Sequence, residues 1–64
     1  MSATPKFITV YRDPAAKCWM ANIIDTNMDS THAPTPYTLE ADADTVVSAM
    51  RRLHPRALDI RAIR

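Results

Sequence analysis

Arginines and acids occupy separate stretches of this sequence. Five arginines fall in the C-terminal stretch 51–64, where Asp59 is the single acid, and five acids fall in the stretch 25–44, which has no lysine or arginine. A guanidinium group pairs with a carboxylate through two parallel hydrogen bonds, so grouped arginines are typical of a surface that docks on an anionic partner. The candidate partner-binding residues are Arg51, Arg52, Arg56, Arg61 and Arg64, and the candidate acidic strip is Asp25, Asp29, Glu40, Asp42 and Asp44.

The arginines also have a plainer interpretation, which is a solvated surface, the commonest fate of charged side chains. Binding to DNA would require several phosphate contacts, and the acidic strip would repel a duplex unless it lies on the far side. The sequence lacks the aromatic platform with interleaved basic residues that single-strand binders use. We therefore expect an acidic patch on a protein as the partner, and no direct binding to nucleic acid.

No catalytic or metal-binding motif accompanies these charges. His32 and His54 have no acid or thiol at ligand spacing, and adding Cys18 still falls short of the four ligands of structural zinc. Ser30 and Ser48 lack the context of a catalytic triad. Phosphate-binding loops need glycine, and the chain has none. We expect no enzymatic activity, no cofactor and no metal.

Size and composition indicate one small globular domain. The chain has 64 residues, of which 47% are hydrophobic and 23% charged, and a domain of this size buries only about 60% of its unfolded surface. A single cysteine excludes an internal disulfide and fits a reducing compartment. Neither a signal peptide nor an apolar run of about 20 residues is present. We expect a flexible tail at 1–5 and one soluble, cytosolic domain at 6–64.

Four stretches have the composition or alternation of β-strands. β-branched and aromatic residues fill 6–11, and a turn is expected at 12–16, where proline follows aspartate. The second stretch is apolar on both faces, which favours a central strand that buries Trp19. A long polar loop at 26–35 precedes the third stretch, which Pro36 places at a sheet edge. The expected strands are 6–11, 17–25, 36–40 and 57–63.

A helix is expected between the last two strands. Asp42 is the predicted N-cap, Asp44 lies in the first turn, and Arg51 and Arg52 lie in the last turn, where cations are favoured. Pro55 ends the helix. The predicted fold is α+β: an antiparallel sheet of three or four strands with one helix packed across it, in the order β-β-(β)-α-β. The predicted apolar stripe is Ala43, Val46, Val47, Met50, Leu53 and His54.

This layout resembles a family of small phage proteins, the host RNA polymerase inhibitors of T-seven-type coliphages. The matching pieces are the strand Lys17-Cys18-Trp19-Met20-Ala21-Asn22, the stretch from Tyr37 to Pro55, and the closing Asp59-Ile60-Arg61-Ala62-Ile63-Arg64. Together they cover residues 17–64 with at least one gap. Family members have two arginines two residues apart on the closing strand; here Arg64 matches the second, and Ala62 stands at the place of the first, beside Arg61.

The resemblance implies a monomeric inhibitor that acts in the cytoplasm of a host bacterium. Its closing-strand arginines would dock on the acidic jaw of the RNA polymerase β′ subunit, which blocks the entry of promoter DNA and prevents open-complex formation. The acidic strip would repel or mimic DNA. The alternatives are another phage host-takeover inhibitor, such as an anti-CRISPR protein, an antitoxin-like regulatory module that dimerises through an edge strand, and a direct nucleic-acid binder.

Overall fold

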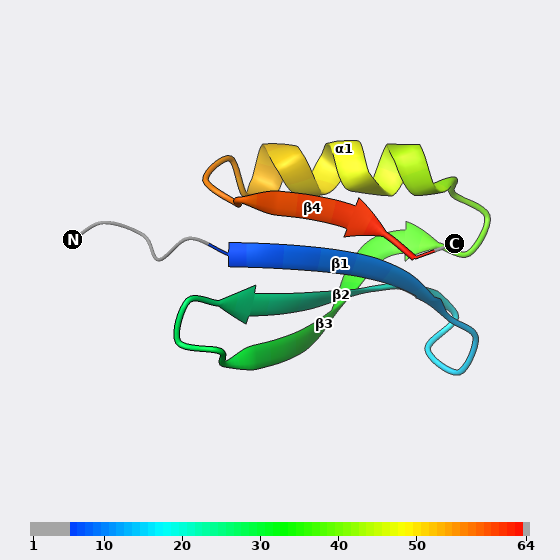
Figure 1. Cartoon of the computed structure of the whole chain (residues 1–64). Helices are drawn as coiled ribbons and strands as arrows, with labels where there is room; N and C mark the ends of the chain where they lie inside the picture. The colour runs from blue at the N-terminus through cyan, green and yellow to red at the C-terminus, as the bar shows by residue number, and fades with distance from the viewer. Residues whose placement is uncertain (1–5, 64) are drawn as a thin grey trace.

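The computed structural model describes residues 6–63, and these form the predicted α+β fold (Figure 1). The expected tail at 1–5 and the candidate residue Arg64 lie outside the described residues. One helix packs on a four-stranded sheet, as Figure 1 shows. The elements in chain order are β1 (Lys6–Asp13), β2 (Cys18–Asp25), β3 (Ser30–Thr38), α1 (Ala43–Leu53) and β4 (Asp59–Ala62).

The sheet is mixed rather than antiparallel throughout. Its strand order is β3-β2-β1-β4; β1 and β3 each pair with β2 in antiparallel fashion, whereas β4 pairs with β1 in parallel. The antiparallel expectation is therefore correct for three strands and wrong for β4. The physical reason is the helix: α1 runs back along the sheet, so the strand that follows it has the direction of β3, which is also the direction of β1 (Figure 1).

The core lies between α1 and one face of the sheet. Strand alternation puts Ile8 and Val10 of β1 on this face, beside Trp19 of β2, which is only 1% exposed. Burial of each large side chain contributes about 1.5–3 kcal/mol. The buried core residues are Ile8, Val10, Trp19, Ala21, Val46, Met50 and Ile60.

The turn between β1 and β2 is built by an aspartate and a left-handed lysine. The Asp13 carboxylate accepts hydrogen bonds from the N–H groups of Ala15 (3.0 Å) and Ala16 (3.3 Å). Lys17 closes the turn with a φ of 60°, a conformation that glycine adopts most easily. Four residues separate the strands, where a five-residue turn at 12–16 was predicted, because β1 extends two residues beyond the predicted strand end at position 11.

The predicted loop at 26–35 is wrong, because β3 begins at Ser30 and pairs with β2 along most of that stretch. Only a short turn separates the two strands. In it, the Asp25 carboxylate accepts hydrogen bonds from the N–H groups of Asn27 (2.9 Å) and Asp29 (3.1 Å). Polar residues are tolerated in β3 because it is an edge strand with no helix or strand beyond it in the described part of the chain.

A threonine side chain repairs an irregularity in the pairing of β2 with β3. The register shifts between Cys18, which pairs with Thr38, and Met20, which pairs with Pro34, so residues 35–37 of β3 lie across from Trp19 alone. The buried hydroxyl of Thr35 donates a hydrogen bond to the Trp19 carbonyl (2.8 Å) and accepts one from the Tyr37 N–H (3.2 Å). One side chain thereby satisfies two backbone groups that the bulge would leave unpaired.

The boundaries of α1 are those the sequence predicts. Asp42 is the N-cap, and its carboxylate accepts a hydrogen bond from the Thr45 N–H at 2.7 Å. His54 is the C-cap, and its N–H donates to the Met50 carbonyl at 2.8 Å. The predicted apolar stripe holds for most of its length and is wrong for Leu53, the last residue of α1, which is 64% exposed.

Candidate partner-binding site

Three of the candidate arginines gather where α1 ends. Arg51 and Arg52 occupy the last turn of the helix, and Arg56 lies in the turn that follows. All three side chains are exposed, and among residues 6–63 no acid lies within ion-pair distance of any of them. The helix macrodipole favours cations at this end. We call Arg51, Arg52 and Arg56 the arginine end.

The arginine of β4 is separate from this group. Arg61 lies on the sheet face opposite α1, since its neighbour Ile60 is buried against the helix side. Its Nε donates a hydrogen bond to Asp59 Oδ2 at 2.8 Å, and its Nη2 contacts the same oxygen. The pair is well exposed, so it contributes little to stability. It nonetheless occupies the Arg61 guanidinium, which the resemblance assigns to docking.

The candidate acids lie in two groups at opposite ends of the sheet (Figure 1). Asp25 and Asp29 belong to the turn between β2 and β3, and the Asp25 carboxylate is used in that turn. Glu40, Asp42 and Asp44 lie at the start of α1, where negative charge is stabilised. Charge is therefore polarised along the helix, with acids at its N-terminal end and the arginine end at its C-terminal end.

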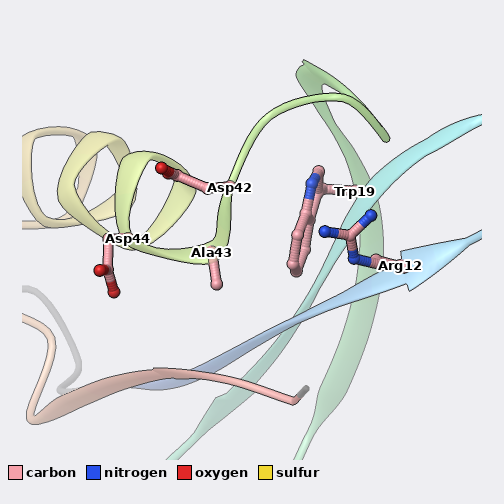
Figure 2. A pocket seen from close by; sticks show the side chains of 5 residues that line it. All are labelled: Arg12, Trp19, Asp42, Ala43 and Asp44. Atoms are coloured by element: carbon pink, nitrogen blue, oxygen red, sulfur yellow. The ribbon is translucent and has the colours of Figure 1, made fainter.

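A hollow of about 390 Å³ lies beside the start of α1, and it contains an arginine that the sequence analysis did not single out (Figure 2). The Arg12 guanidinium carbon is 4.8 Å from the centroid of the Trp19 ring, a cation–π contact. Arg12 Nη1 also donates a hydrogen bond to the Leu39 carbonyl at 2.8 Å. The hollow is lined by Arg12, Trp19, Asp42, Ala43 and Asp44.

The side chains that line this hollow stabilise the fold, and they leave no exposed aromatic ring on which a ligand could stack. The indole Nε1 of Trp19 donates to the Ala41 carbonyl at 3.0 Å, so the ring ties β2 to the segment before α1. Figure 2 shows the Arg12 guanidinium alongside the ring, which is itself almost fully buried. Arg12 lies at the boundary of the predicted turn, where no periodic pattern marks it. The one signal in the sequence is a cation and a tryptophan on either side of that turn, which the pairing of β1 with β2 places opposite each other.

The histidines and the cysteine are dispersed. His32 Nδ1 lies 2.9 Å from the hydroxyl of Tyr11 on the face opposite the helix, while His54 caps α1 and Cys18 is half-buried in β2. Within residues 6–63, no three residues of the types His, Cys, Asp and Glu gather as a metal site. In the same part of the chain, no helix has the length and apolar character needed to cross a membrane.

The arginine end is therefore the part of the described surface with the most charge left available for a partner. Arg61 is engaged by Asp59, and Arg12 is engaged by Trp19 and Leu39. Comparison with family models, curated proteins and solved structures finds no match to this chain.

Proposed function

We propose that this protein is a non-enzymatic binding protein that docks its arginine end on an acidic surface of a partner protein. One observation carries the proposal: Arg51, Arg52 and Arg56 are exposed together, with no acid at ion-pair distance among the described residues. Their guanidinium groups keep their capacity for bidentate pairing with carboxylates. Grouped charge of one sign also steers the encounter and selects the partner.

The partner we propose is the acidic jaw of the bacterial RNA polymerase β′ subunit, in the cytoplasm of a phage-infected host. This choice is supported by the resemblance of residues 17–64 to the coliphage inhibitors. With the arginine end against the polymerase, the acids at the other end of α1 point away from the contact and repel incoming promoter DNA. The proposal moves the docking surface from the closing strand to the arginine end, because Asp59 occupies Arg61.

The test is promoter-dependent transcription by bacterial RNA polymerase holoenzyme, with two double variants that change the charge equally. We expect inhibition at near-stoichiometric concentration. Arg51→Glu with Arg52→Glu should weaken inhibition by about 30-fold, the effect of losing about 2 kcal/mol at a binding hot spot. Arg61→Glu with Arg64→Glu should weaken inhibition clearly less, because Asp59 already engages Arg61. Circular dichroism confirms that both variants fold.

Each other outcome has a definite meaning. The reverse ranking of the two variants would place docking on the closing strand, as in the coliphage family, and would refute the arginine end. A wild-type protein that neither inhibits transcription nor retains β′ in a pull-down would remove RNA polymerase as the partner. Binding to any DNA, with an affinity that falls steeply with salt, would replace the protein partner with a nucleic acid.

A further inference from the structure

The two edges of the sheet differ in their ability to accept another strand. β3 forms one edge, and it contains Pro34 and Pro36, which have no backbone N–H to donate. Prolines on an edge strand are a known protection against pairing with other chains. β4 forms the other edge, and among the described residues it pairs with β1 alone.

The pairing of β4 with β1 shows which backbone groups point outward. The Ile63 N–H donates to the Val10 carbonyl at 2.9 Å, and the register pairs Thr9 with Arg61. In a parallel ladder, alternate residues bond to the neighbouring strand. The backbone N–H and C=O groups of Asp59 and Arg61 therefore point toward β1, as the N–H of Ile63 does. The N–H and C=O groups of Ile60 and Ala62 are turned away from β1 and have no strand partner within residues 6–63.

The surroundings of this edge suit an extended chain with apolar and acidic side chains. Leu53 and Leu58 are 64% and 61% exposed, near the end of α1 and the start of β4. Between these elements lies a hollow of about 320 Å³ that is lined by Arg51, His54, Pro55 and residues from Ala57 to Ile60. Arg51 and Arg56 belong to the arginine end, so the same edge has apolar contact area and unpaired positive charge.

We propose that the β4 edge binds an extended acidic segment of the partner protein, which adds to the sheet as a fifth strand. This inference rests on the proposed function, because the arginine end supplies the charge that selects the segment. Backbone hydrogen bonds to Ile60 and Ala62 give affinity, and a side chain placed on Leu58 with carboxylates near Arg51 gives specificity. A second copy of the chain is a poorer occupant, since the region 56–64 contains three arginines and one acid and would face its own charge.

The probe is a blocked peptide of about eight residues, long enough to span β4 at about 3.3 Å per residue, in which glutamate alternates with valine. Its matched control has the same sequence with every second backbone amide N-methylated, in both registers, which removes donors and leaves the charge unchanged. We expect the control peptides to bind at least about tenfold more weakly, because two or more backbone hydrogen bonds are lost. We also expect slower hydrogen exchange at the Ile60 and Ala62 amides when the unmodified peptide is bound.

Two protein variants test the edge and the charge separately. Ala62→Pro removes an outward N–H and should weaken peptide binding at least about tenfold, whereas Ala62→Val keeps the N–H and should not. Arg51→Glu with Arg56→Glu should weaken binding of all the peptides. If Ala62→Pro does not fold, the N-methylated peptides still decide the question.

The outcomes separate this inference from the proposed function. Equal binding of all peptides, with loss only in the arginine variant, would overturn strand addition and leave the arginine end as the docking surface. Sensitivity to N-methylation without sensitivity to Arg51→Glu and Arg56→Glu would support the edge and refute an acidic partner. No peptide binding at all, or a dimer in native mass spectrometry that Ala62→Pro abolishes, would overturn the proposed occupant.

Discussion

Replacing Thr35 with valine should cost this protein a large part of its stability, although the two side chains have nearly the same shape. Thr35 is 8% exposed, and its hydroxyl bonds the Trp19 carbonyl at 2.8 Å and the Tyr37 N–H at 3.2 Å. A buried polar group that loses its partner costs about 1–3 kcal/mol. The Trp19 bond is the shorter and more buried of the two, so we expect a loss of about 2 kcal/mol, against a total of roughly 3–5 kcal/mol for a core of this size.

Thr35→Ser is the matched control, because it keeps the hydroxyl and removes one methyl group, at a cost of about 1 kcal/mol. The expected order of stability is wild type, then serine, then valine. The assay is urea unfolding followed by far-UV circular dichroism, with the fluorescence of Trp19 as a second probe; unchanged slopes show that stability alone has changed. A valine variant as stable as the serine variant would refute the claim that Thr35 supplies hydrogen bonds missing from the bulge.

Two further substitutions test the local geometry. Asp42→Ala should lower the free energy of unfolding by about 1 kcal/mol through loss of the hydrogen bond to Thr45. Asp42→Asn can still cap the helix and should lower it by only a few tenths of a kcal/mol. If the urea melts of the two variants overlay, the Asp42 side chain does not stabilise the helix by hydrogen bonding. Lys17→Gly should raise the free energy of unfolding by up to about 1 kcal/mol, because a non-glycine residue at φ 60° is strained, and Lys17→Ala should not raise it; a glycine variant less stable than wild type in thermal unfolding would contradict that strain.

The helix and the core were predictable from the sequence because local and periodic signals agree there. Asp42 is a strong N-cap and Pro55 cannot continue a helix, so α1 has the expected ends. The apolar second strand predicted a buried Trp19, and Trp19 is 1% exposed. The fold class follows, since one amphipathic helix and a sheet with one apolar face must cover each other.

The edges of the sheet were not predictable in the same way, because edge strands have weak sequence signals. β3 begins with Ser30-Thr31-His32, which has the composition of a loop. Its pairing with β2 alone keeps this segment in the sheet. The Thr35 hydroxyl bonds two backbone groups at its bulge, and no sequence pattern marks that residue. The parallel direction of β4 depends on the connection rather than on its residues. The arginines were identified as a group, but only the structure shows that Arg61 is paired with Asp59, whereas the residues of the arginine end are not paired with an acid among the described residues.

If β4 binds the partner segment as proposed, the two edges of the sheet divide stability from binding in this small domain. β3 is closed by Pro34 and Pro36 and is joined to the core through Thr35, so changes there should lower stability and leave peptide affinity intact once the protein is folded. In β4 the backbone N–H of Ala62 points away from β1, so Ala62→Pro should lower peptide affinity in protein that is still folded. This separation matters in a domain with only a few kcal/mol of stability, because a partner can then bind at one edge without disturbing the hydrogen bonds at the other. Thr35→Val and Ala62→Pro, measured in both assays, test this division directly: a loss of peptide affinity in folded Thr35→Val protein would show that the two edges are coupled.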